Sequence, residues 1–244
     1  SNLRLGVNAG NSIASGGNYN TVVGDEAGTA ITTGDNNVAV GTNAADALTT
    51  GVRNVAIGYD ALTTAVDDDQ NTAVGAYALN TTEADDNTGV GYLALYANTT
   101  GASNVAVGVQ ALDANTTASN NTAVGYAALT ANTEASYITG VGYQALKLNT
   151  TGTANVALGA DALRQNLTGA ANVAVGNNAL VLNTASNNTA VGKDAGTAVT
   201  SGTQNTFVGA LAGDGTDDGS NNVAVGFEAL SANCGSQNTA LGTR

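Results

Sequence analysis

Carboxylates are the residues of this chain whose type and spacing could do chemistry. They cluster at Asp67-Asp68-Asp69, Asp85-Asp86 and Asp217-Asp218, and paired carboxylates can act as general acid and base. The sequence has no histidine and a single cysteine, Cys234, which excludes Ser-His-Asp and Cys-His nucleophiles and histidine-based metal sites. The acids lie in variable segments where solvated charge is expected. We therefore predict no catalytic residue and no enzymatic activity.

Calcium binding is the second chemistry that these acids could support. The segment Asp214-Gly215-Thr216-Asp217-Asp218-Gly219 places oxygen ligands in a glycine-rich turn, and Asp67 to Asp69 could join Asp85 and Asp86 one repeat along. The glutamate that closes an EF-hand loop is missing, because Val225 stands in its position. The nonapeptide of calcium β-rolls is also absent. The interpretation favoured is solvated turn acids, with no metal site and no cofactor.

Polar and aromatic residues recur at fixed positions and leave other binding functions open. Two sets of asparagines are predicted to stack amide on amide between successive repeats, with a sugar-binding surface there as the alternative. The first set lies four residues before a recurring glycine, and the second is Asn98, Asn115, Asn132, Asn149, Asn166 and Asn183. Tyrosines that follow a recurring glycine could stack on a glycan or pack at an interface between chains; they are Tyr59, Tyr92, Tyr126 and Tyr143. Threonine recurs three residues before that glycine, and a regular threonine array would indicate ice binding. Valine interrupts the array here, for example at Val38 and Val55.

A short repeat that runs through the whole chain must position these residues. The phrase Asn121-Thr122-Ala123-Val124-Gly125, followed by Tyr126-Ala127-Ala128-Leu129, returns every seventeen residues, with three gaps of sixteen. β-Branched residues before the glycine predict a short strand, the Ala-Leu pair predicts a second strand, and Asn-Thr-Thr-Gly segments predict turns. The recurring glycine, called the repeat glycine below, falls at Gly24, Gly41, Gly58, Gly75, Gly91, Gly108, Gly125, Gly142, Gly159, Gly176, Gly192, Gly209, Gly226 and Gly242.

The fixed period predicts the fold class. Periods of about this length are typical of solenoids, in which each repeat forms one coil and is stable only when stacked on its neighbours. We predict an all-β, parallel β-solenoid (β-roll) of about fourteen 17-residue coils. Residues 1–244 are expected to form a single continuous repeat domain without evident caps, so that copies could stack head to tail into a filament.

Charge and hydropathy exclude several partners. The chain has 6 Lys and Arg against 19 Asp and Glu, a formal charge of −13. Nucleic acid is therefore excluded as a partner, because phosphate binding needs a basic track. No apolar run is long enough to cross a bilayer, so we expect no membrane insertion. The single cysteine cannot form a disulfide within the chain.

The predicted strand is apolar on both faces. In Val38-Ala39-Val40 and Val223-Ala224-Val225 the outer two residues point to one face and the middle residue to the other. A strand apolar on both faces is typical of one that is covered on both sides. The solenoid interior covers one face, and we expect a second copy of the chain to cover the other, as a homotrimer. A monomer with a modestly apolar stripe is the alternative.

The repeated phrases resemble two families of fibre proteins. Asn-Thr-Ala-Val-Gly-Tyr-Xaa-Ala-Leu and Asn-Thr-Thr-Gly resemble repeats of bacteriophage and cyanophage tail-fibre-type proteins, and Asn-Val-Ala-Val-Gly is similar to the head repeat of trimeric autotransporter adhesins. The adhesin resemblance implies a left-handed β-roll with three chains side by side. Together the resemblances imply an extracellular, non-enzymatic fibre segment, structural or adhesive, on a virion or a cell surface. A monomeric solenoid that binds ice or a cell-surface glycan is the alternative.

Overall fold

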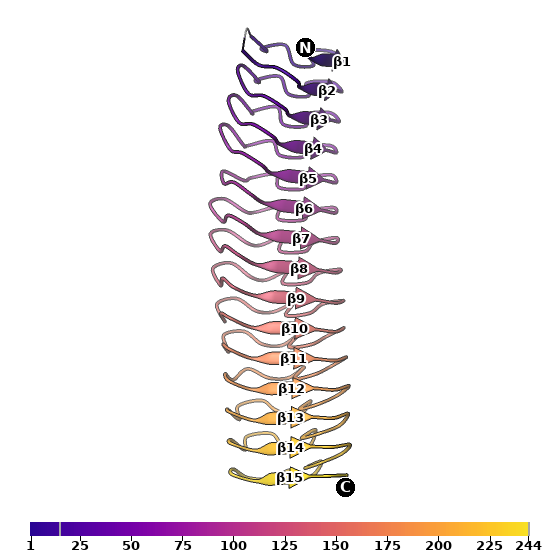
Figure 1. The fold of residues 1–244 in the computed structure, drawn as a ribbon, viewed down its shortest axis with the longest axis vertical. Coiled ribbons are helices and arrows are strands. Elements are labelled where there is room, and N and C mark those ends of the chain that lie inside the picture. Colours follow the sequence, from indigo (N-terminus) through magenta and orange to yellow (C-terminus); the bar gives the residue numbers. More distant parts are fainter. Residues whose placement is uncertain (15, 244) are drawn as a thin grey trace. The chain divides into compact units, whose positions relative to one another are not determined.

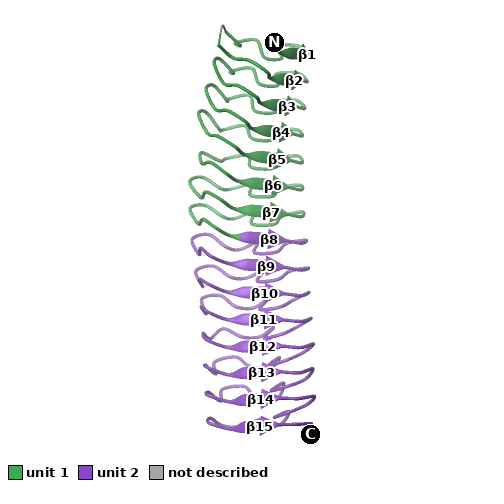
Figure 2. Cartoon of the chain, in the orientation of Figure 1, with its two compact units in different colours: residues 1–121 green, residues 122–244 purple. Residues whose placement is uncertain are grey.

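The structure is a computed structural model that describes residues 1–14 and 16–243. It is an all-β, parallel β-solenoid of about fourteen turns of roughly 17 residues, which confirms the predicted fold class (Figure 1). The chain divides into two compact units, Ser1–Asn121 and Thr122–Arg244 (Figure 2). One continuous domain over residues 1–244 stays a prediction.

Each unit is a stack of three-residue strands that pair in parallel in the order of the sequence. The first unit contains β1 (Leu3–Leu5), β2 (Thr21–Val23), β3 (Val38–Val40), β4 (Val55–Ile57), β5 (Thr72–Val74), β6 (Thr88–Val90) and β7 (Val105–Val107). The second contains β8 (Thr122–Val124), β9 (Thr139–Val141), β10 (Val156–Leu158), β11 (Val173–Val175), β12 (Thr189–Val191), β13 (Thr206–Val208), β14 (Val223–Val225) and β15 (Thr239–Leu241).

The pairing is in register, so that equivalent residues of successive repeats stack on one another. In the first unit, Val38 pairs with Val55, Ala39 with Ala56 and Val40 with Ile57. The same one-to-one register holds in the second unit, for example between β10 and β11. A sequence position of the repeat therefore becomes a column of side chains along each unit.

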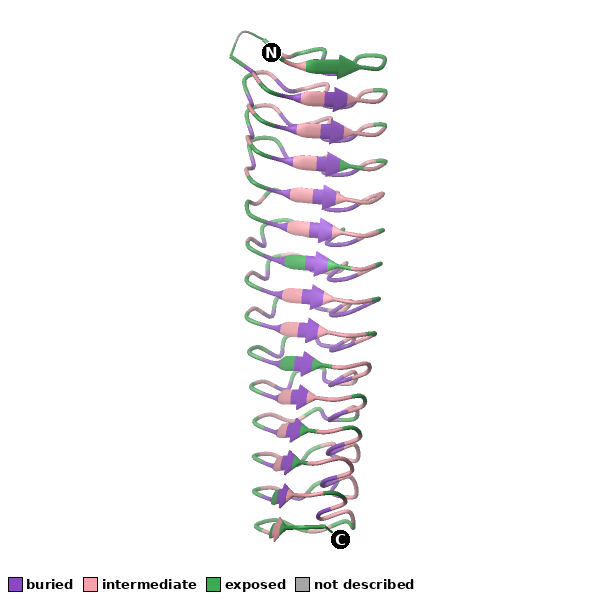
Figure 3. Cartoon of the chain, turned by 45° about the vertical axis from the view of Figure 1, so that its right-hand side comes forward, coloured by how far each residue is buried: buried purple, intermediate pink, exposed green. Residues whose placement is uncertain are grey.

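The interior of both units is built from small and branched apolar residues. The middle residue of each strand from β2 to β14 is buried, as Figure 3 shows. The Ala-Leu pair of the repeat is also buried, for example Ala111 and Leu112 in the first unit and Ala145 and Leu146 in the second. The structure thus decides which of the two apolar strand faces the interior covers, and it is the alanine face.

In the interior, a larger side chain at one position is accompanied by smaller residues at neighbouring positions. Phe207 replaces the strand alanine in β13 and is fully buried. The leucine position of the repeat is glycine at Gly196 and Gly213, and a Cβ on Gly196 would lie 3.0 Å from the Phe207 ring. The glycine that replaces the strand alanine at Gly89 instead lies against Leu79. Close packing requires this compensation, because an interior of fixed volume tolerates an added side chain only where another is removed.

The predicted second strand at the Ala-Leu pair is wrong. Gln110 and Leu112 have φ of 58° and 51°, and the equivalent leucines Leu146 and Leu163 both have φ of 52°. These left-handed residues turn the chain back after the strand and direct the leucine into the interior. The conformation costs roughly 1–2 kcal/mol for a residue with a Cβ, which burial of a leucine, at about 1.5–3 kcal/mol, can offset.

Glycine is required at the repeat position because the backbone of the next coil approaches it closely, and also because its φ is positive. Gly41 has φ of +132°, and a Cβ there would lie 2.5 Å from the carbonyl oxygen of Gly58 in the next coil. Any other residue would displace one coil from the next.

We expect Gly41→Ala to destabilise the protein by more than about 2 kcal/mol, because it combines backbone strain of roughly 1–3 kcal/mol with a steric clash. Thermal or urea unfolding measures the change. Gly235→Ala is the matched control, since a Cβ at Gly235 would have no atom within 4 Å. Equal stability of the two variants would contradict this role of the repeat glycine.

Candidate functional site

The most regular exposed feature of the molecule is the outer face of the strands. The first and third strand residues point away from the interior: Val105 and Val107 are 37% and 36% exposed, whereas Ala106 between them is fully buried. We call the surface made by these two columns the outer strand face. Its third-residue column contains only Val, Ile and Leu, and its first-residue column contains Thr, Val and, in β1, Leu.

The third-residue column of the outer strand face is apolar along each unit. In-register pairing places each of its side chains beside the equivalent residue of the next strand. Ile57 and Val107 in the first unit and Leu158 and Val208 in the second are each more than a third exposed in the single chain. Of the two strand faces, the interior covers only the alanine face. Cover of the other face by a second copy stays a prediction.

The asparagine four residues before the repeat glycine joins one coil to the next. The Asn104 side chain is fully buried. Its Oδ1 accepts a hydrogen bond from the Asn121 backbone N–H at 3.0 Å, and its Nδ2 donates to the Ala118 carbonyl at 2.8 Å. The equivalent Asn205 accepts from the Asn222 N–H and donates to the Gly219 carbonyl in the second unit. Most side-chain hydrogen bonds of this set are thus to the backbone. The predicted amide-on-amide contact is found at some positions, since Asn104 Nδ2 also donates to Asn87 Oδ1 at 3.2 Å and Asn238 Nδ2 donates to Asn222 Oδ1 at 3.0 Å.

The second set of asparagines does stack amide on amide, as predicted. Asn115 Nδ2 donates to Asn98 Oδ1 at 2.7 Å in the first unit. Asn166 Nδ2 donates to Asn149 Oδ1 at 2.8 Å in the second. Both sets are buried, which gives them a structural role and leaves no surface there for a sugar.

Aspartates of the acidic clusters accept hydrogen bonds from backbone N–H groups. Asp69 Oδ1 accepts from the Val52 backbone N–H at 2.8 Å, and Asp85 Oδ1 accepts from the Asp69 N–H at 2.8 Å. Asp68 Oδ2 accepts from the Val66 N–H at 3.2 Å. Within residues 1–14 and 16–243, no group of three or more His, Cys, Asp or Glu side chains is arranged to hold a metal ion.

The tyrosines that follow a repeat glycine form two exposed clusters. In the first unit the Tyr77 ring makes edge contacts with Tyr59 at 5.4 Å and with Tyr92 at 6.2 Å between centroids. In the second unit Tyr126 stacks on Tyr143 at 5.5 Å. All but Tyr77 are about half exposed. Both alternatives given for them, a glycan and a second chain, remain consistent with this exposure.

Three half-buried aspartates share one position of the repeat, and only Asp214 of the three is named from the sequence, as a possible calcium ligand. Asp46, Asp113 and Asp214 each lie five residues after a repeat glycine, and Oδ1 of each is buried without a hydrogen-bond partner. Burial raises the pKa of each carboxyl above its ordinary value of 3.8, against backbone hydrogen bonds that lower it. Their shared position, five residues after a repeat glycine, is the signal in the sequence that identifies them as a set.

Comparison with protein-family models finds no match, and comparison with curated proteins finds no relative. In the part of the chain that the structure describes, no helix could cross a membrane.

We expect Asp113→Asn to stabilise the protein at neutral pH. The folded pKa of Asp113 is raised, so the wild type is most stable below the unfolded pKa of about 3.8 and loses that stability as pH rises through the folded pKa. The gain in melting temperature should therefore vanish below roughly pH 3.8. Melting curves across pH measure it, with exposed Glu83→Gln as the control of equal charge change. A gain that persists at low pH would refute the explanation.

Asn104→Ala should destabilise the protein by roughly 1–3 kcal/mol, because it removes the side-chain acceptor of the buried Asn121 N–H. The Ala118 carbonyl keeps its hydrogen bond from Asn115 Nδ2. Urea unfolding provides the measurement. The exposed Asn177→Ala serves as the control and should cost much less. Similar losses in both variants would show that the buried hydrogen bonds do not hold the coils together.

Proposed function

We propose that this chain is a non-enzymatic structural segment of an extracellular fibre that self-associates through the outer strand face. The observation that supports the proposal is the unbroken apolar third-residue column of that face, more than a third exposed at Ile57, Leu158 and Val208. An isolated exposed valine is ordinary on a protein surface. A column repeated on every strand of a unit is a contiguous apolar patch, which marks an interaction site.

The energetics favour a second copy of the chain as the partner. Covering one half-exposed Val or Leu contributes on the order of 1 kcal/mol, and every coil contributes again. An identical periodic surface matches this spacing along its whole length. Three chains side by side agree with the resemblance of the repeats to trimeric adhesin heads and phage tail fibres, and in such a fibre the acidic surface favours solubility.

A monomeric solenoid that binds ice or glycan is the alternative. The half-exposed hydroxyls of Thr21, Thr72 and Thr88 on the outer strand face favour it, whereas Val38 and Val55 interrupt that column. A monomer that inhibits ice recrystallisation would support this alternative over the fibre.

Light scattering coupled to size exclusion tests self-association. We expect a mass of three chains of 23.7 kDa each. Leu158→Lys should dissociate this assembly, because it places a charge in the covered column, while circular dichroism stays unchanged because Leu158 is 48% exposed in the single chain. Thr168→Lys, at an exposed turn of the same unit, is the matched control and should leave the mass unchanged. A wild-type mass of 23.7 kDa at every concentration would overturn the proposal.

A further inference from the structure

The second unit carries a shallow hollow lined by Lys147, Leu148, Arg164 and Gln165. Lys147 and Arg164 occupy the same repeat position, five residues after Gly142 and Gly159. Their coils are adjacent, since the Leu148 N–H donates to the Arg164 carbonyl at 3.1 Å. The hollow is therefore formed by equivalent side chains of two successive coils.

The charge of this hollow is opposite to that of the molecule. Two of the six cationic residues lie side by side here in a chain of net charge −13. Like charges on neighbouring side chains repel each other. Asp161 Oδ1 lies 3.6 Å from Arg164 Nε, and in the described ranges Lys147 has no ion pair. One carboxylate against two cations leaves a local charge of about +1, so the site favours an anion.

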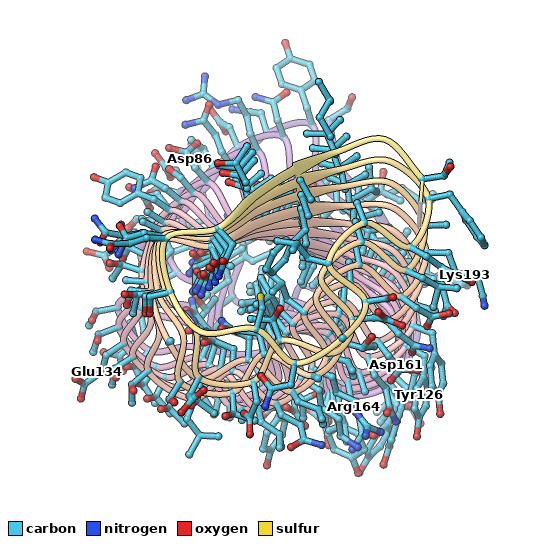
Figure 4. The ribbon with its side chains drawn as sticks, turned by 90° about the horizontal axis from the view of Figure 1, so that it is seen from below. Asp86, Tyr126, Glu134, Asp161, Arg164 and Lys193 are labelled. Carbon is cyan, nitrogen blue, oxygen red and sulfur yellow. The ribbon has the colours of Figure 1, made fainter. Side chains whose placement is uncertain are left out.

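An aromatic platform continues from the hollow. Tyr126 and Tyr143 stack with an interplanar angle of 12° and are 47% and 51% exposed. The Asp161 N–H donates to the Tyr143 carbonyl at 2.8 Å, so Asp161 links the tyrosines to Arg164. Figure 4 shows Tyr126, Asp161 and Arg164 projecting outward from the same side of the ribbon. We call Tyr126, Tyr143, Lys147, Leu148, Arg164 and Gln165 the basic-aromatic surface.

We propose that the basic-aromatic surface binds an acidic oligosaccharide. Lys147 and Arg164 would pair with sugar carboxylates, since an arginine fork binds a carboxylate bidentately. The negative faces of the tyrosine rings attract the polarised C–H groups of a sugar ring, and the Gln165 amide can bond to hydroxyls.

The length of the surface argues for an oligosaccharide. It spans three successive coils, roughly 10 Å between the outer two at about 4.8 Å per coil. A small inorganic anion would engage the cations and leave the rings uncovered. The proposal is independent of self-association, because none of these residues belongs to the outer strand face.

Calorimetric titration with trigalacturonate, using the full chain, tests the proposal. We expect binding that weakens as salt is raised, and no binding of the methyl-esterified trisaccharide. Lys147→Gln and Arg164→Gln should each weaken binding roughly tenfold or more, since a charge-assisted hydrogen bond of this kind carries about that factor. Lys193→Gln removes an exposed lysine of the same unit that pairs with Asp194, and as the matched control it should leave binding unchanged. Tyr143→Ala should abolish binding, and Tyr143→Phe should retain it.

Several results would overturn the proposal. The first is a failure of trigalacturonate to bind a chain whose circular dichroism shows it folded, and the second is equally tight binding of its methyl ester. Equal weakening by Lys193→Gln, or equally tight binding of inorganic phosphate, would show a general response to charge. A change in the mass of the assembly in Lys147→Gln or Arg164→Gln would make the surface a contact between copies of the chain.

Discussion

The structure depends on hydrogen bonds that run from each coil to the next through the buried asparagines. A coil of this length cannot satisfy its own inward backbone groups, so the groups that point inward must find partners in the neighbouring coil. The Asn104 side chain supplies both kinds of bond, because its amide accepts from Asn121 and donates to Ala118. No apolar side chain of similar size offers a donor and an acceptor together. This requirement explains why the residue recurs at one position of the repeat.

Strict register follows from that constraint and determines how the interior is filled. Because equivalent positions stack, a larger residue at one position must be balanced by a smaller one beside it. Phe207 with Gly196 and Gly213 shows this balance. The repeat glycine has no such freedom, since it combines a positive φ with backbone of the next coil as its nearest neighbour.

Only the columns of side chains that point outward can contact a partner or a ligand, because the interior is filled and buried. A repeated outward position gives a long surface of uniform chemistry, as in the apolar column of the outer strand face. A local departure from the repeat gives a distinct site instead. Lys147 and Arg164 are such a departure, since the same position elsewhere carries uncharged or acidic residues such as Thr63 and Asp113. The two proposals therefore use the same scaffold in different ways.

The sequence by itself determined the period, the position of the strand, its two apolar faces and the all-β solenoid, because these follow from the recurrence of residue types along the chain. Only the tertiary structure decided the left-handed conformation of Leu112 and its equivalents, the backbone partners of Asn104, and the use of Asp69 and Asp85 as backbone acceptors. It also brought Tyr143, Asp161 and Arg164 together. The partners of Asn104, Asp69 and Asp85 and the contact between Tyr143 and Asp161 all depend on atoms of a neighbouring coil, about one turn away along the sequence, which residue types and propensities do not encode.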